Sequence, residues 1–226
     1  MTSGTSAHEK TFFGHPRGLA TLFGTELWER FSWYGLRAIL ATFMVTSPAT
    51  GGLGLTEATA QAIVGIYGAL IYLVALPGGW VADRVLGARK AVLWGGVVIM
   101  CGHISMAVPV RTGAFVALGL FLIIVGTGLL KPNISTMVGR LYPQNDDARR
   151  DAGFSIFYMG INIGAFVAPI VVGWLASGDR WHLGFGAAAV GMALGLIQYV
   201  RGRRHLRGVG DEPGHRLTPP SAGTSA

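Results

Sequence analysis

The chain has 226 residues, of which 51% are hydrophobic and 13% are charged, and its mean hydropathy is +0.48. A soluble domain carries about 25% charged residues, so this composition excludes an ordinary soluble protein and favours a polytopic helical membrane protein. The net charge of +7 does not indicate nucleic-acid binding, because the basic residues border apolar segments, as the positive-inside rule expects.

The hydropathy pattern divides the chain into a polar N-terminal tail at 1–17, an apolar bundle at 18–200 and a C-terminal tail at 201–226. The polar tail has no short apolar core, so no cleavable signal peptide is predicted. The C-terminal tail begins with arginines and continues as a Pro-, Gly-, Ser- and Thr-rich stretch typical of disorder. Within the bundle we expect six membrane-spanning helices, at about 18–46, 57–82, 91–109, 114–138, 153–176 and 181–200.

The lysines and arginines outside these spans are distributed unequally between the two sides of the predicted bundle. The side that holds both termini has thirteen of them, whereas the other side has only Arg111 and Arg180. Because positive residues accumulate in cytoplasmic segments, the sequence predicts that both termini lie in the cytoplasm.

A cluster of charged and aromatic residues lies within the first predicted span. Glu26, Glu29 and Arg30 occur at i, i+3 and i+4, and Trp33 and Tyr34 follow at i+7 and i+8, so all five share one face of a helix. Each charge costs roughly 2.5–3.5 kcal/mol or more at the centre of a membrane helix. The cluster is therefore either a structural ion-pair set that locks helices together or a functional proton site.

Other polar residues in the spans admit more than one interpretation from the residues alone. Lys131, in the fourth span, would balance the second glutamate if it faces the cluster. Arg37 either joins the cluster or reaches the membrane surface. Tyr72 is typical of a packed aromatic residue, and Asn162 of a hydrogen bond between neighbouring helices. His103 stands alone in the third span and is predicted to be a packed histidine.

Four segments carry motifs that resemble those of one transporter family. Residues 26–35, ELWERFSWYG, resemble the E-x-x-E-R-F-x-Y-Y-G motif of the proton-dependent oligopeptide transporters (POT/PTR). Residues 157–164, FYMGINIG, resemble their F-Y-x-x-I-N-x-G motif, and residues 126–133, GTGLLKPN, resemble their helix 4 segment. Residues 79–90, GWVADRVLGARK, resemble the loop between helices 2 and 3 of the major facilitator superfamily, to which these transporters belong.

The resemblance implies an all-α membrane protein whose six transmembrane helices form the N-terminal half of a major facilitator fold, built as a 3+3 inverted repeat. Family members have twelve or more helices in two halves, and this sequence matches only the first. The second half would supply the opposite wall of the cavity, including a helix 10 carboxylate expected to meet the peptide amino group. A further departure is Trp33, which replaces the usual Tyr and so exchanges a hydroxyl for an indole N–H.

The resemblance also implies roles for individual residues. Proton coupling is implied for Glu26 and Glu29, with Arg30 and Lys131 as their partners and as anchors for the peptide carboxylate. The implied substrate-binding residues are Arg30, Trp33, Tyr34, Tyr72, Lys131 and Asn162. A gating and structural clasp on the cytoplasmic side is implied for Asp83, Arg84 and Arg89. Protons are the implied coupling ion, and no metal or other cofactor is expected.

Enzyme chemistry is not predicted, because the sequence has no H-E-x-x-H, G-x-S-x-G or P-loop motif. The first functional hypothesis is proton-coupled symport of di- and tripeptides across the cell membrane, with small peptides and the lipid bilayer as partners. An alternative is a truncated or split-gene half-transporter that does not transport alone and needs a second six-helix half or a homodimer. A third keeps the superfamily but changes the cargo to a sugar, a drug or a nitrate-like anion.

Overall fold

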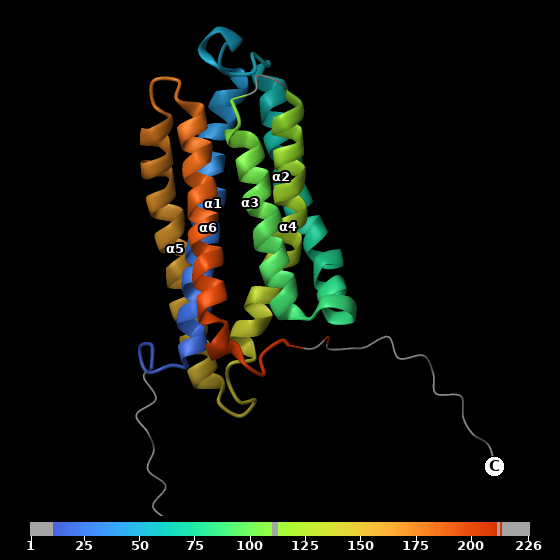
Figure 1. The fold of residues 1–226 in the computed structure, drawn as a ribbon, viewed down its shortest axis with the longest axis vertical. Coiled ribbons are helices and arrows are strands. Elements are labelled where there is room, and N and C mark those ends of the chain that lie inside the picture. Colours follow the sequence, from blue (N-terminus) through green and yellow to red (C-terminus); the bar gives the residue numbers. More distant parts are fainter. Residues whose placement is uncertain (1–10, 110–112, 212, 214–226) are drawn as a thin grey trace, which may run out of the picture.

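The computed structural model describes residues 11–109, 113–211 and 213, and this part of the chain forms an elongated bundle of helices (Figure 1). Its six long helices are α1 (Arg17–Val45), α2 (Glu57–Val81), α3 (Ala88–Ala107), α4 (Gly113–Gly139), α5 (Asp147–Ala176) and α6 (Trp181–Gly202). Outside the described residues lie residues 1–10 and most of the predicted C-terminal tail. Arg111, which was counted in the predicted charge distribution, also lies outside them.

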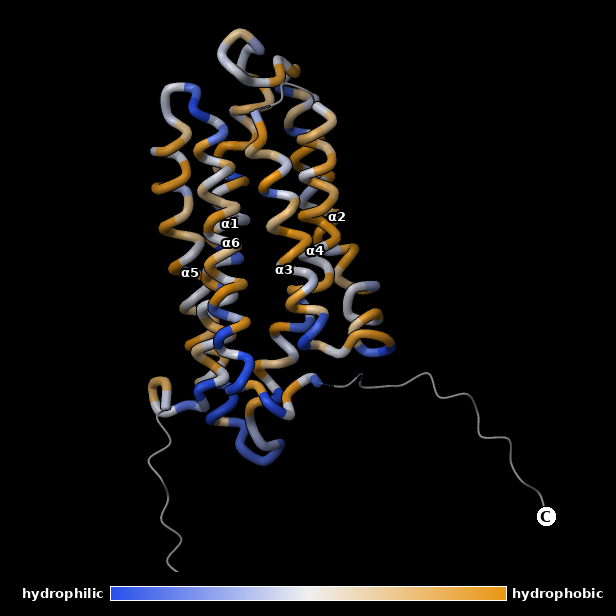
Figure 2. The backbone as a smooth tube through the Cα atoms, viewed as in Figure 1, coloured by the Kyte–Doolittle hydropathy of each residue, from blue (hydrophilic) through white to orange (hydrophobic). Residues whose placement is uncertain are grey.

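Five of these helices, α2 to α6, are long and apolar enough to cross a membrane. The remaining helix, α1, has a sufficient length of about 44 Å but carries charged residues in its central turns. Figure 2 shows apolar residues along the helices and hydrophilic residues gathered at the end where α1 begins and α6 ends. We call this end the basic end. Its basic residues are Arg17, Arg84, Arg89, Lys90, Arg140, Arg149, Arg150, Arg201, Arg203, Arg204 and Arg207.

The helices form two groups of three. In one group α1 packs along α5 and α6, in the other α4 packs along α2 and α3, and a contact between α3 and α6 joins the groups (Figure 1). In α1, 18 of 29 residues are buried, whereas in α2 only 4 of 25 are buried. The helix with the most charge inside its span is therefore an inner helix, and α2 is a peripheral one.

Local capping decides where several helices begin and end. The predicted charged turn at 83–90 is partly helical, because α2 continues into a π-helical turn at Ala82–Leu86 before the chain reverses at Gly87. Gly87 has φ +77°, a conformation that glycine adopts without steric cost. The start of α5 precedes the predicted span, since the side chain of Asp146 accepts a hydrogen bond from the backbone N–H of Arg149 at 3.3 Å and caps the helix.

The described part of the predicted N-terminal tail is packed against the basic end of the bundle. His15 is buried, and its Nδ1 lies 2.9 Å from the hydroxyl of Tyr142, which follows α4. Arg149, in the first turn of α5, donates a hydrogen bond to the carbonyl of Gly14 at 2.7 Å. These contacts fix the entry of α1 to the connection between α4 and α5.

Glycines allow the helices of the second group to touch backbone to backbone. A Cβ atom placed on Gly78 of α2 would lie 2.0 Å from the carbonyl oxygen of Gly128 in α4. A Cβ atom on Gly95 of α3 would lie 2.7 Å from the carbonyl oxygen of Gly126. Small residues at helix interfaces permit this close approach, which drives helix association where the surrounding lipid removes the hydrophobic effect.

This packing predicts opposite effects for two glycine-to-alanine changes on α2. Gly78→Ala should lower the free energy of unfolding by 1–3 kcal/mol or more, because its methyl group meets a backbone oxygen that cannot move aside. Gly65→Ala is the matched control, since a Cβ atom there meets nothing within 4 Å, and it should stabilise the helix by up to about 1 kcal/mol. Unfolding of the purified protein in mixed micelles, followed by circular dichroism, measures both values; equal effects would contradict the close approach of α2 and α4.

Candidate functional site

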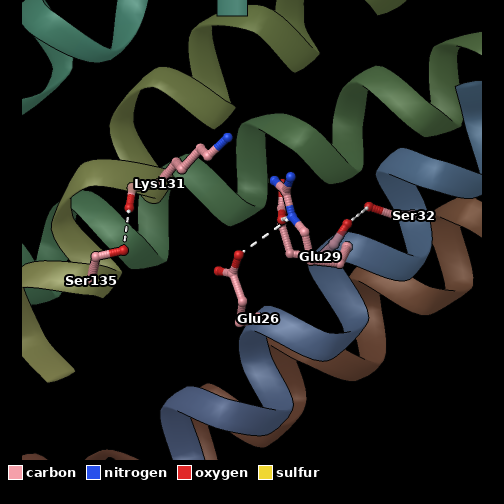
Figure 3. Close-up of polar contacts among 6 residues, drawn as sticks. Glu26, Glu29, Ser32, Lys131 and Ser135 are labelled. Atoms are coloured by element: carbon pink, nitrogen blue, oxygen red, sulfur yellow. Dashed lines mark hydrogen bonds and ion pairs between the residues drawn. The ribbon is translucent and has the colours of Figure 1, made fainter. Parts of the chain in front are cut away.

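The charged cluster of the first helix is buried and internally paired. Glu26, Glu29 and Arg30 are each at most 5% exposed. The guanidinium group of Arg30 makes two hydrogen bonds to the carboxylate of Glu29, from Nη2 to Oε1 at 2.7 Å and from Nε to Oε2 at 2.5 Å (Figure 3). The same Nε lies 3.3 Å from Oε1 of Glu26, one turn earlier. One arginine therefore forms ion pairs with two carboxylates.

The two carboxylates are not equivalent. Both side-chain oxygens of Glu29 are bonded to Arg30, whereas Oε2 of Glu26 is buried and has no hydrogen-bond partner among the described residues. A buried acceptor without a partner costs about 1–3 kcal/mol, and more when it is charged. Adding a proton to Glu26 removes its charge, so this carboxylate is the member of the cluster best suited to change its protonation state.

Lys131 on α4 faces the same region but is not bonded to the glutamates. Its Nζ lies 4.7 Å above the ring of Tyr72 in a cation–π contact, and no ion pair joins it to Glu26 or Glu29 in the described part of the chain. Figure 3 shows its side chain extending on the cluster's side of α4. The cation of Lys131 is therefore held only by an aromatic face, which leaves it able to bind an anion.

Trp33 contacts two arginines through its ring. The guanidinium carbons of Arg30 and Arg37 lie 5.3 and 5.2 Å from the centre of its ring, and the ring of Tyr34 packs edge-on at 4.6 Å. The indole is only 7% exposed. The position of Arg37, which the sequence left open, is thus beside the cluster, and Trp33 holds the two guanidinium groups in place. Each cation–π contact contributes about 0.5–2 kcal/mol.

The remaining predicted substrate contacts lie on exposed surfaces. Tyr72 is 66% exposed on α2. Asn162 is exposed on α5, where it lines a hollow of about 450 Å³ with Tyr158 and Phe166. No hydrogen bond links Asn162 to the charged cluster in the described residues. The structure therefore brings the predicted site residues of α1 together directly, whereas Asn162 makes no hydrogen bond to them in the described part of the chain.

The three residues predicted as a clasp form no ion pair with one another in the described part of the chain, and their role stays a prediction. Asp83 and Arg84 are exposed in the π-helical turn after α2. Arg89 instead forms an ion pair with Asp211, and its backbone N–H donates a hydrogen bond to the carbonyl of Gly210 at 3.0 Å. The segment after α6 thus folds back onto the start of α3. Sequence reasoning missed Asp211 because it lies in a stretch whose composition is typical of disorder.

Comparison with known proteins identifies the family. The family model described as "PTR2: POT family" matches residues 89–217, more than half of the chain. The chain belongs to the POT family. Among its POT relatives, the "Di-/tripeptide transporter" of Lactococcus lactis subsp. lactis is 56% identical over 213 residues, covering 92% of this chain and 42% of that protein.

Solved structures of POT proteins have the same fold as this chain. A crystal structure of "peptide transporter POT in complex with sulfate" is 55% identical with a TM-score of 0.90, over 95% of this chain and 43% of that one. A "POT family transporter in complex with thioalcohol conjugated peptide" is 49% identical with a TM-score of 0.89, over 93% of this chain and 43% of that one. The chain thus spans less than half the length of the POT relatives that it matches.

The two carboxylates differ in their contacts with Arg30, so their isosteric substitutions should lower the free energy of unfolding by different amounts. Glu29→Gln should destabilise this POT chain by about 3–5 kcal/mol, because it removes one partner of a buried ion pair and leaves Arg30 poorly neutralised. Glu26→Gln should cost less than half as much, since its carboxylate makes only the longer contact. Unfolding in mixed micelles measures both free energies. A larger loss for Glu26→Gln would contradict the asymmetry of the cluster.

Proposed function

We propose that this chain forms the proton-coupling half of a di-/tripeptide symporter and that it acts together with a second six-helix half. The observation that carries the proposal is the buried set of Glu26, Glu29 and Arg30, in which one carboxylate oxygen has no hydrogen-bond partner among the described residues. Ionisable groups within a membrane span are costly and are typically functional. The similarity to a di-/tripeptide transporter supports peptides as the cargo.

Proton coupling follows from the competition for Arg30. While both glutamates are ionised, the guanidinium group is shared between them. A proton on Glu26 removes one of these attractions, so that Arg30 is held by Glu29 alone and its remaining donors can turn toward a substrate. A peptide carboxylate then binds Arg30 and Lys131, and release of the proton to the cytoplasm restores the original pairing and expels the peptide.

The proposed site has more positive than negative side chains, which favours a substrate with an anionic group. The site has two acids, Glu26 and Glu29, and three bases, Arg30, Arg37 and Lys131. The net positive charge of this set is matched by the C-terminal carboxylate of a peptide, which also supplies the bidentate geometry that guanidinium groups recognise. Tyr34 and Tyr72 would contact the peptide beside these cations.

The proposed topology is a 3+3 inverted repeat with both ends in the cytoplasm. The helix contacts support the repeat, because α1 packs on α5 and α6 as α4 packs on α2 and α3. Exchanging the first three helices with the last three therefore reproduces the main contacts. The basic end supports the orientation, since positively charged residues accumulate on the cytoplasmic side of a bacterial cell membrane.

The second half would cover an exposed apolar face of this chain. Regularly spaced large side chains are exposed on two helices, namely Leu73, Leu76 and Trp80 on α2 and Phe166, Ile170 and Trp174 on α5. Their i, i+3/i+4, i+7/i+8 spacing places each set along one helix face. A further part of a longer polypeptide, a separate half-transporter or a second copy of this chain would each provide the missing wall of the cavity.

Proteoliposomes test the transport proposal directly. Peptide-driven proton uptake is measured with this chain alone and with a co-expressed second half. Glu29→Gln and Lys131→Ala should each abolish uptake in the active preparation. Lys90→Ala and Glu57→Gln, which change exposed residues outside the site, should leave it unchanged. Proton-driven uptake that survives both site variants would refute this mechanism.

The role of Glu26 predicts a separation of two activities. Glu26→Gln mimics a permanently protonated carboxyl group, so proton-driven accumulation of peptide should be lost while exchange of external for internal peptide continues. Loss of exchange as well would assign Glu26 to substrate binding instead.

Competition by dipeptides against a sugar, a drug or nitrate in the same vesicles identifies the cargo.

A further inference from the structure

An apolar groove runs along the outside of the bundle between α5 and α6. It has a volume of about 690 Å³ and is floored by Leu27 and Trp28 of α1. Its walls include Val167 on α5 and Leu183 and Val190 on α6, which are 39%, 51% and 60% exposed. Glu26, Glu29 and Arg30 are not part of its lining, so the groove is distinct from the proposed transport site.

The groove has the depth of one membrane leaflet. On α6 it extends from His182 to Leu194, a rise of about 18 Å along a helix. The hydrocarbon core of a bilayer is about 30 Å thick, so each leaflet occupies roughly half of that. The groove begins near the end of the bundle opposite the basic end and stops near the middle of α6, which matches the reach of one acyl chain.

The walls combine branched aliphatic side chains with small residues. Two glycines of α6 are already used by α1, since a Cβ atom on Gly191 would lie 2.6 Å from the ring of Phe31 and one on Gly195 would lie 3.0 Å from Cβ of Trp28. Gly186 stays open on the groove, so small residues alone do not decide between a helix and a lipid. The length of the groove decides, because a membrane-spanning helix extends over the full thickness of the bilayer, whereas one acyl chain extends over half of it.

A cation lies close in sequence to the end of the groove that His182 lines, because Arg180 precedes His182 by two residues. Arg180, directly before α6, is exposed, and its guanidinium group bonds only to Ser177, through the carbonyl at 2.9 Å and the hydroxyl at 3.4 Å. No acidic side chain pairs with it in the part of the chain that the structure describes. His182, two residues after Arg180, lines the groove, and its Nδ1 is buried without a hydrogen-bond partner among the described residues.

We propose that this groove binds one acyl chain of an anionic phospholipid, whose phosphate is held by Arg180. In the proposed orientation the lipid belongs to the outer leaflet. The apolar walls select the chain, and the unpaired guanidinium group selects a phosphate without a compensating positive headgroup, as in phosphatidylglycerol.

Two glycines provide a matched pair of variants. Gly186 borders the groove, and a Cβ atom there meets nothing within 4 Å. Gly186→Phe should therefore fill the groove without disturbing the packing of the bundle. Gly173 on α5 is equally open but does not line the groove, so Gly173→Phe controls for the added ring. Arg180→Gln removes the positive charge of this side chain and leaves the groove intact.

Native mass spectrometry of the purified full chain, incubated with dioleoyl-phosphatidylglycerol or dioleoyl-phosphatidylcholine, counts the lipids retained. The unaltered chain and Gly173→Phe should each keep one phosphatidylglycerol, and Gly186→Phe should bind it roughly tenfold more weakly. Arg180→Gln should reduce the preference for phosphatidylglycerol over phosphatidylcholine by about tenfold, as expected for the loss of one charge-assisted hydrogen bond. Equal retention by Gly186→Phe and Gly173→Phe would overturn the proposal, as would an unchanged preference in Arg180→Gln. A dimeric mass that Gly186→Phe abolishes would assign the groove to a second copy instead.

A second measurement remains decisive if Gly186→Phe fails to fold. In vesicles of phosphatidylglycerol with dibrominated acyl chains, bromine quenches a tryptophan that it touches. The quenching lost in Trp28→Phe reports on the floor of the groove, and no loss would overturn the proposal. Neither measurement involves transport, so the lipid proposal and the transport proposal can fail separately.

Discussion

The pairing of one arginine with two glutamates on α1 constrains the arrangement of the whole bundle. Hydrocarbon offers no hydrogen bonds to a charged side chain, so each ionised group must be satisfied within the protein. A lipid-facing helix could not carry Glu26, Glu29 and Arg30. Accordingly, a larger share of the residues of α1 than of α2 is buried. Neighbouring helices must then approach it closely. Gly164 on α5 permits this, since a Cβ atom there would lie 2.4 Å from the carbonyl oxygen of Leu27.

The sequence predicts part of the geometry of this cluster, because that part depends on helix periodicity. The i, i+4 spacing of Glu26 and Arg30 predicts their contact once α1 is helical, whereas the pair of Arg30 with the adjacent Glu29 depends on side-chain rotamers. The apolar segments likewise predict six helices, and the motifs predict the family, which the matching family model confirms.

Features that depend on distant parts of the chain could not be predicted in this way. Trp33 matched a substrate-contact position, but its burial and its contacts with Arg30 and Arg37 depend on side-chain rotamers and on the packing around α1. The ion pair of Arg89 with Asp211 joins residues far apart in the chain, and local composition around Asp211 indicates only a flexible tail. The grouping of α1 with α5 and α6 is also nonlocal, since adjacency in the sequence would have placed it with α2.

The exposed apolar surfaces of the bundle differ in chemistry, and this difference separates their proposed partners. The exposed surfaces of α2 and α5 carry aromatic residues, including Trp80, Phe166 and Trp174, whose rigid rings lose little conformational entropy when they pack against protein. The walls of the groove between α5 and α6 are mostly aliphatic, and on α6 the groove extends from His182 to Leu194, about the depth of one leaflet. A protein half must contact the bundle over the full thickness of the membrane, so the aromatic surfaces suit it, whereas the shorter aliphatic groove suits a chain that ends at the bilayer midplane. Because α5 contributes to both surfaces, a lipid in the groove would support the side of α5 that the second half does not reach.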